Sequence, residues 1–249
     1  MRFQDQVVIV TGGSSGIGAG TAAAFAREGA RVCITGRDPE RTEAVAREVG
    51  AVDFGLGDIC DPDYCREYVK KTALREGRLD VLVNNAGTIV REDTVDTTDE
   101  QWQETMAINV NAVFYMSREA LKVMRAQGSG AIVNLSSTCG LVGSQGLTAY
   151  CASKGAVSLM TQAMALDCAL DGIRVNAVCP GATDTPMLFS AHKVRPSRAE
   201  MDEVQKLTVP MQRMARPEEV VQVILFLASS DAGYVTGALL PVDGGYTCQ

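Results

Sequence analysis

The sequence predicts an α/β fold, a doubly wound parallel sheet of about seven strands with helices on both faces. Short apolar runs rich in β-branched residues are continuous rather than alternating, which is typical of strands buried on both sides of a parallel sheet. Longer helical patterns separate these runs along the whole chain, and this alternation is characteristic of doubly wound sheets. The sequence shows no repeat, low-complexity tract or linker-like shift, so we expect residues 1–249 to form a single domain.

Each predicted strand is a short apolar run, and the seven runs are 7–10, 31–35, 54–56, 81–83, 131–135, 175–178 and 239–242. Helical patterns fill the intervals at 16–28, 40–49, 63–76, 99–127, 150–170 and 217–228. The run from Thr98 to Gln101 is a capping signal for the fourth helix, and Pro217 with two following glutamates suits the start of the last. The polar stretch 187–216 carries no strand pattern, and we expect it to be a lid or binding loop.

Composition and charge exclude several classes of protein. Lys and Arg number 23 against 30 Asp and Glu, which gives a net charge of −7 and argues against a nucleic-acid partner. The longest apolar stretch, Val220 to Ala228, is far too short to span a membrane, and no signal-peptide core is present. We therefore expect a cytoplasmic protein with neither a nucleic-acid nor a membrane partner.

The eight cysteines have no CxxC spacing, and His192 is the only histidine, so we expect no metal site. Several lie in apolar runs, where cysteine behaves as a small hydrophobic residue. Reduced thiols are favoured over a disulfide framework. Only Cys139 and Cys151 lie near the residues that carry chemistry, and packing is favoured for both.

The first predicted strand runs into a glycine-rich turn that opens a helix, Thr11-Gly12-Gly13-Ser14-Ser15-Gly16-Ile17-Gly18. Glycines let backbone amides approach a pyrophosphate, and a helix N-terminus adds partial positive charge. The spacing is G-x-x-x-G-x-G, and a glycine-rich turn alone is weak evidence, since it also occurs as a structural loop. Its strand–turn–helix context favours a dinucleotide site.

The second strand indicates which dinucleotide. An acidic residue usually ends this strand and binds the ribose hydroxyls. Here Gly36 stands at that position and Arg37 follows, which leaves room and charge for a 2′-phosphate. NADP(H) is therefore favoured, while NAD(H) stays open because Asp38 can bind a ribose. Asp58, after the third strand, is a candidate partner for the adenine amino group.

Further polar residues follow later strands, at the sheet edge where α/β folds bind ligands. Asn84-Asn85-Ala86-Gly87 ends one strand and Ser136-Ser137 ends another, while Tyr150 and Lys154 share a helix face at i, i+4. Taken alone, each pattern is also typical of an ordinary loop or of the edge of an amphipathic helix.

Together, these residues resemble the short-chain dehydrogenase/reductase family, and the resemblance covers the full chain. Its motifs here are Thr11-Gly12-x-x-x-Gly16-x-Gly18, Asn84-Asn85-Ala86-Gly87, Asn109, Ser137, Tyr150-x-x-x-Lys154, Pro180-Gly181-x-x-x-Thr185 and Val242-Asp243-Gly244-Gly245. Ser137 rather than Ser136 has the family's separation of thirteen residues from Tyr150. The resemblance implies a Rossmann fold and hydride transfer between a nicotinamide cofactor and a ketone or secondary alcohol.

The resemblance also implies the site residues. The implied catalytic residues are Asn109, Ser137, Tyr150 and Lys154. The implied cofactor-binding residues are Gly12, Ser14, Ser15, Gly16, Ile17, Gly18, Arg37, Asp58, Ile59, Asn85, Ala86, Gly87, Tyr150, Lys154, Pro180, Gly181, Thr183 and Thr185. Tyr150 would be the general acid in reduction and the base in oxidation. We expect the Lys154 ammonium to lower the pKa of Tyr150, Ser137 to orient the substrate oxygen, and Asn109 to support a proton-reloading water chain.

The substrate pocket is expected from 88–90, 139–142, Gln145 and 187–209, whose apolar content predicts a partly apolar substrate. The family implies a homotetramer packed through 99–127 and 150–170. A 3-oxoacyl reductase, a hydroxysteroid dehydrogenase and a polyol dehydrogenase all stay open, although the −7 charge does not favour an acidic carrier protein. The alternative from another class is a cofactor-binding regulator without turnover, which the presence of both Tyr150 and Lys154 disfavours.

Overall fold

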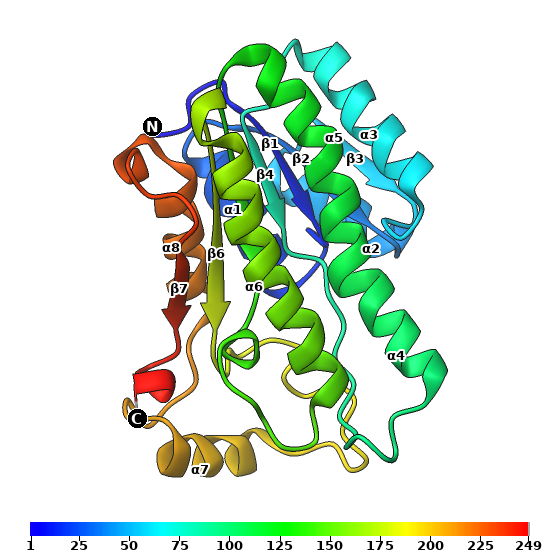
Figure 1. Cartoon of the computed structure of the whole chain (residues 1–249), viewed down its shortest axis with the longest axis vertical. Helices are drawn as coiled ribbons and strands as arrows, with labels where there is room; N and C mark the ends of the chain where they lie inside the picture. Colours follow the sequence, from blue (N-terminus) through cyan, green and yellow to red (C-terminus); the bar gives the residue numbers. More distant parts are fainter. Residues whose placement is uncertain (249) are drawn as a thin grey trace.

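The computed structural model, which describes residues 1–248, confirms the predicted sheet of seven parallel strands (Figure 1). The strands are β1 (Val7–Thr11), β2 (Arg31–Gly36), β3 (Asp53–Leu56), β4 (Val81–Asn84), β5 (Gly130–Leu135), β6 (Ile173–Pro180) and β7 (Leu239–Val242). Their order in the sheet is β3-β2-β1-β4-β5-β6-β7. The chain reverses its winding direction between β1 and β4, and a ligand crevice is expected at such a switch point.

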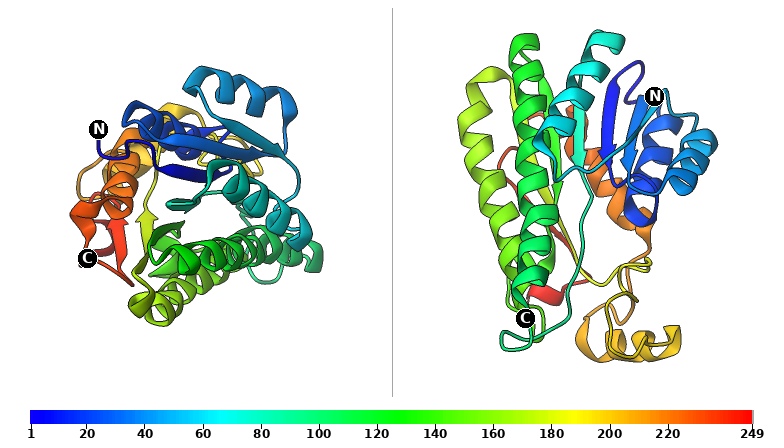
Figure 2. Two further views of the ribbon diagram at one scale, coloured as in Figure 1. Left: turned by 90° about the horizontal axis from the view of Figure 1, so that it is seen from above. Right: turned by 90° about the vertical axis from the view of Figure 1, so that its right-hand side faces the viewer.

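Helices cover both faces of the sheet (Figure 2). They are α1 (Gly16–Arg27), α2 (Pro39–Val49), α3 (Pro62–Glu76), α4 (Asp99–Met106), α5 (Ala112–Gln127), α6 (Thr148–Cys168), α7 (Arg198–Thr208) and α8 (Pro217–Ala228).

The residues of β1 show why two layers form. Val8 and Val10 belong to a core shared with α1 and α8, whereas Val7 and Ile9 belong to a second core shared with α3, α5 and α6. Successive strand side chains point to opposite faces, so a continuous apolar run supplies both cores.

Two predicted elements differ from the structure. The helix expected over 99–127 is interrupted by a π-helical turn, Ala107–Asn111, between α4 and α5. The stretch 187–216 was expected to be a lid or binding loop, and the structure shows that it contains the helix α7. A capping box at its start, between Ser197 and Glu200, was a readable signal for this helix.

The stretch 187–216 lies beyond the carboxyl ends of the strands, where Figure 1 shows α7 below the arrowheads of β6 and β7. Thr183 forms an isolated parallel bridge with Ala215, which ties the two ends of this excursion together. Among residues 1–248, no helix has both the length and the apolar character needed to cross a membrane.

Candidate active site

A cavity of about 720 Å³ opens at the carboxyl edge of the sheet and brings together nearly all the predicted site residues. Those that line it are Gly12, Ser14, Ser15, Gly16, Ile17, Arg37, Asp58, Ile59, Asn85, Ala86, Gly87, Ser137, Tyr150, Lys154, Pro180, Gly181, Thr183 and Thr185. Gly18 and Asn109 are the two that do not line it. The cavity therefore extends from the glycine-rich turn to the catalytic side chains.

The glycine-rich turn has the form of a phosphate cradle. Gly12 and Gly16 have φ of 63° and 52°, and a Cβ at Gly12 would lie 2.9 Å from Ala86 Cα. A Cβ at Gly18 would collide with the Gly12 carbonyl oxygen, so Gly18 acts by allowing close packing within the turn. The first turn of α1 has no acidic residue, and the Ser15 side chain does not cap it. These features fit a dinucleotide pyrophosphate at the helix N-terminus.

Asn85 joins this turn to the end of β4. Its Nδ2 donates to the carbonyl oxygens of Thr11 and Gly12 at 3.0 and 3.1 Å. The Thr11 hydroxyl accepts from the backbone amides of Asn85 and Ala86 at 3.1 and 3.2 Å. The side chain of Asn85 is thus engaged in holding two loops of the cavity in register.

The turn after β2 forms the other boundary of the cavity. A Cβ at Gly36 would collide with the Thr42 hydroxyl, which donates to the Asp38 carbonyl at 2.6 Å, so packing excludes a carboxylate at position 36. Asp38 caps α2 by accepting from the Arg41 amide at 3.0 Å and also pairs with the Arg41 guanidinium at 3.5 Å. Arg37 is exposed, lines the cavity and forms no ion pair with any of residues 1–248. Its cation is therefore available to a ligand.

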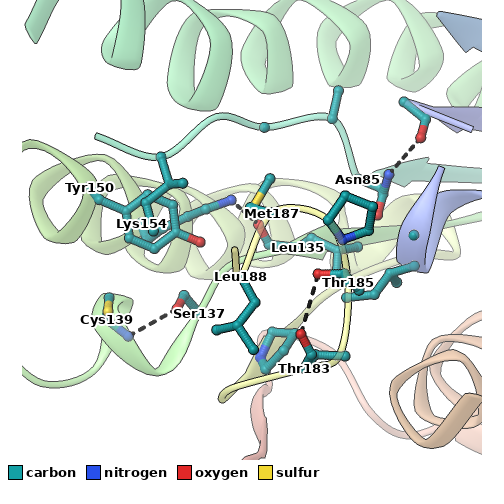
Figure 3. A pocket seen from close by; sticks show the side chains of 18 of the residues that line it. Asn85, Leu135, Ser137, Cys139, Tyr150, Lys154, Thr183, Thr185, Met187 and Leu188 are labelled. Atoms are coloured by element: carbon teal, nitrogen blue, oxygen red, sulfur yellow. Dashed lines mark hydrogen bonds between the residues drawn. The ribbon is translucent and has the colours of Figure 1, made fainter. Parts of the chain in front are cut away.

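Tyr150 and Lys154 project from α6 towards the end of β5 (Figure 3). Lys154 Nζ donates to the Leu135 carbonyl at 2.7 Å and lies 5.7 Å from the centre of the Tyr150 ring. Ser137 follows the end of β5 near these side chains, and its hydroxyl accepts from the Cys139 amide at 3.1 Å (Figure 3). Ser136 Oγ, by contrast, donates to the Lys154 carbonyl at 3.0 Å, which ties β5 to α6. Both serines line the cavity but make different contacts, and the assignment of Ser137 from the motif spacing stays a prediction.

Burial controls the titration of both catalytic side chains. It raises the pKa of Tyr150 well above its ordinary value, and a hydrogen bond with Ser137 and the charge of Arg91 oppose this rise. Burial also lowers the pKa of Lys154 to about 8. Loss of hydration is therefore the largest influence on the Tyr150 pKa, and the lowering expected from Lys154 and from a bound oxidised nicotinamide stays a prediction.

Asn109 lies in the π-helical turn and is fully buried. Its Oδ1 accepts from the Thr88 amide at 2.8 Å, and its Nδ2 donates to the Thr88 carbonyl and to Ser153 Oγ at 2.9 and 3.0 Å. A single π turn often occurs at functional sites. Here the π turn carries Asn109, whose hydrogen bonds hold the loop after β4 in position. Asn109 does not line the cavity.

Thr183 and Thr185 follow β6 in a loop braced by its own hydroxyls. Thr183 Oγ1 donates to the Gly181 carbonyl at 3.1 Å and Thr185 Oγ1 to the Thr183 carbonyl at 3.3 Å (Figure 3). Both residues line the cavity, and Thr185 lies beside Gly16. This loop therefore faces the nucleotide cradle from the opposite side.

The substrate end of the cavity matches the prediction only in part. From the predicted segments the lining includes Ile89, Cys139, Val142, Met187, Leu188, Met201, Val204, Gln205, Thr208 and Val209. Gln145 does not line it, whereas Ser144 and Leu147 do. Arg91 also lines it and was missed, although it directly follows the predicted segment 88–90. The available signal for Arg91 was its place as a cation at the end of an apolar loop.

The cysteines and the histidine take the following places. Cys33, Cys65, Cys168 and Cys179 are buried in the core, as expected of small hydrophobic residues, and all eight cysteines are free thiols. His192 Nε2 lies 3.1 Å from the Leu188 carbonyl, so it contacts its own loop rather than only solvent. Within residues 1–248, no three His, Cys, Asp or Glu side chains gather as a metal site would require.

The fold and the site define a Rossmann-type oxidoreductase, and comparison with known proteins agrees. Residues 12–247 match the family described as "Enoyl-(Acyl carrier protein) reductase". The chain is 39% identical to the NADP-dependent (R)-specific alcohol dehydrogenase of Lentilactobacillus kefiri, over all of this chain and 99% of that protein. It is 41% identical to the cis-4-hydroxycyclohexanecarboxylate dehydrogenase of Sinomonas cyclohexanicum, covering 98% of each. The crystal structure of levodione reductase superposes with a TM-score of 0.94 at 34% identity, covering 99% of both chains. The chain belongs to the short-chain dehydrogenase/reductase family.

Proposed function

We propose that this protein is an NADP(H)-dependent oxidoreductase that interconverts a ketone and a secondary alcohol. The single observation that carries the proposal is the meeting of Ser137, Tyr150 and Lys154 in the cavity that also contains the phosphate cradle. Both relatives are named as dehydrogenases of alcohols or hydroxy compounds, and the relative from Lentilactobacillus kefiri is also named as NADP-dependent.

We assign to the residues of the site the roles that the family resemblance implies. The bound nicotinamide would supply or accept the hydride. Tyr150 Oη holds the proton that passes to or from the substrate oxygen, and Ser137 Oγ orients that oxygen by a hydrogen bond. Lys154 holds the nicotinamide ribose, and its Nζ already has one fixed acceptor in the Leu135 carbonyl.

The preference for NADP(H) is supported by the turn after β2. The collision with Thr42 leaves position 36 without a carboxylate to repel a 2′-phosphate, and the exposed Arg37 offers an unpaired cation. Asp38 is already engaged by Arg41 and by the cap of α2, which weakens its candidacy as a ribose ligand. Asp58 and Ile59 would enclose the adenine from the β3 side.

The substrate is proposed to be a small, partly apolar molecule, because Ile89, Val142, Met187 and Leu188 line its end of the cavity. A 3-oxoacyl, hydroxysteroid or polyol substrate remains an alternative within the same chemistry. We also propose a cytoplasmic location, which the eight free thiols favour.

A homotetramer is proposed from the exposed apolar side chains of α5 and α6. Phe114 is 42% exposed, Leu159 69% and Leu166 82%. Such side chains favour burial against another copy of the chain. Light scattering should give a mass of four chains, and a monomer would contradict this part of the proposal.

Parallel calorimetric titrations with NADPH and NADH test the proposed cofactor. We expect NADPH to bind at least tenfold more tightly, in keeping with a charge-assisted phosphate contact. A screen of ketones and alcohols then follows the absorbance of the reduced cofactor. Tighter binding of NADH would contradict the assignment of Arg37. If the cofactor binds but no carbonyl compound or alcohol is turned over, the alternative of a cofactor-binding regulator without turnover would be supported instead.

A further inference from the structure

Arg91 is a cation at the substrate end of the cavity that the proposed reaction does not use. It follows the loop after β4, is half-buried and lines the same cavity as Tyr150. Its guanidinium donates to the carbonyl oxygens of Leu188 and Ser190, and its charge acts to lower the pKa of Tyr150.

The Arg91 guanidinium has no counter-ion among residues 1–248. No carboxylate of residues 1–248 forms an ion pair with Arg91, and the neighbouring Glu92 and Asp96 face Lys193 Nζ instead, at 3.0 and 3.7 Å. Two ionisable groups act on Arg91, namely Tyr150 and Cys139. Both have a raised pKa and are uncharged at neutral pH. A partly buried charge without a partner is costly, so it is usually paired when its site is filled.

One edge of the guanidinium is already occupied. Arg91 Nε donates to the Ser190 carbonyl at 3.0 Å, and Nη2 donates to the Leu188 carbonyl at 3.1 Å. A guanidinium has five N–H donors, so three remain, on Nη1 and Nη2. These two nitrogens form the end-on pair that binds a carboxylate with two parallel hydrogen bonds. The two carbonyls of the excursion thus fix the guanidinium while leaving its carboxylate-binding edge free.

The surroundings limit the rest of the substrate. Ile89, Val142, Leu147, Met187 and Leu188 line this part of the cavity and supply no further charge. Figure 3 shows Leu188 lying between Ser137 and Thr183, on the chain segment whose carbonyl holds Arg91. An apolar body with a single anionic group would meet both features.

Resting on the function proposed above, we propose that the substrate is an apolar oxo or hydroxy acid whose carboxylate pairs with Arg91. The carboxylate lies at one end of the molecule and the reacting carbon lies at Tyr150 and Ser137. Arg91 therefore determines substrate specificity, and it also couples substrate binding to the 187–190 segment through the two carbonyls.

Binding of inert probes tests this without turnover. Cyclohexanecarboxylate and cyclohexanecarboxamide have the same apolar ring, and calorimetry on the NADP⁺-loaded protein compares them. We expect the carboxylate to bind ~10–100-fold more tightly than the amide, as a charge-assisted pair should, and Arg91→Gln to abolish the difference. Arg195→Gln is the matched control, because Arg195 lies exposed in the same excursion but outside the cavity. It should retain the full preference.

Turnover of 4-oxocyclohexanecarboxylate and its carboxamide gives the second measurement. Arg91→Gln should raise KM for the carboxylate ~10–100-fold with little change in kcat, while kcat/KM for the carboxamide stays within about threefold. Equal binding of the two inert probes to the native protein, or an equal loss for both in Arg91→Gln, would overturn the proposal and leave Arg91 as a support for the excursion. If the carboxylate binds preferentially but no ketone is reduced, the proposed reaction fails while the anion site stands.

Discussion

The two ends of the cavity are built in opposite ways. At the catalytic end, Tyr150 and Lys154 are only 8% and 4% exposed, and core backbone holds Lys154 in place. At the end near β2, Arg37 and Arg41 are exposed and lie at the start of a surface helix. Burial makes the first end rigid and strongly shifts its pKa values, whereas the second end can change charge without disturbing the core. We therefore expect the catalytic rate and the choice of cofactor to be separable by mutation.

Replacing Tyr150 by Phe should have the largest effect. The variant keeps the ring in its packed site and removes the only atom that carries the proton, so kcat should fall ~10²–10⁴-fold. Calorimetry with NADPH should show binding within about threefold of the native protein. Near-native turnover in a verified Tyr150→Phe sample would show that Tyr150 does not carry the proton, and it would contradict the proposed separation between the two ends of the cavity.

Ser137 and Ser136 form a matched pair for the next largest effect. Ser137→Ala should lower kcat about 100-fold, because it removes a hydrogen bond aimed at the substrate oxygen. Ser136→Ala removes the contacts with Lys154 and Ser158 within the core, and should act mainly on the free energy of unfolding, by about 1 kcal/mol. Steady-state kinetics and urea unfolding of both variants measure this. The reverse pattern would assign the substrate contact to Ser136.

Arg37→Gln should act at the opposite end of the cavity. Loss of a charge-assisted phosphate contact should raise KM for NADPH ~10–100-fold and leave kcat and the KM for NADH within about threefold. Arg47→Gln is a suitable control, because Arg47 lies on α2, the helix that follows Arg37, but pairs with Glu43 outside the cavity. Equal losses with both cofactors would show that Arg37 acts on folding or on the shared part of the dinucleotide.

The smallest effect concerns stability against pH. Burial lowers the pKa of Lys154 from 10.5 to about 8, so the unfolded chain binds more protons than the folded one between these values. Stability should therefore rise with pH from 8 to 10, by about 2 kcal/mol from this residue, and the penalty is fully present below pH 8. Above pH 10 the raised pKa of Tyr150 acts in the opposite direction, because the unfolded phenol then ionises first.

Between pH 8 and 10 the raised pKa values of Cys33, Cys65, Cys139 and Cys179 lower stability, because the unfolded thiols ionise first, and they do so equally in the native protein and in Lys154→Met. Urea unfolding of both proteins at pH 8 and 10 should therefore show the free energy of unfolding of the native protein rising by about 2 kcal/mol relative to that of Lys154→Met.

Much of the fold was predictable because its signals are local. The continuous runs of β1, β4 and β6 carry the mark of strands covered on both faces, and the core assignments of Val7 to Val10 show both layers. Helix α7 was not predicted, because its segment is polar and carries no strand pattern, although Ser197 and Glu200 form a capping box at its start. The π turn at Asn109 has no comparable local signal, because its extra residue reflects the bonds of Asn109 to Thr88 and Ser153.

By itself, the sequence predicted the order of the strands, the helices other than α7 and the glycine-rich turn, because periodicity and motif spacing are properties of neighbouring residues. Its resemblance to a known family implied the roles of Ser137, Tyr150 and Lys154. Only the tertiary structure decided that Thr42 closes the space beside Gly36, that the charge of Arg91 reaches Tyr150, and that burial raises one catalytic pKa while lowering the other. Steric exclusion, Coulomb interaction and desolvation depend on which groups become neighbours in space, and those neighbours come from segments far apart in the chain.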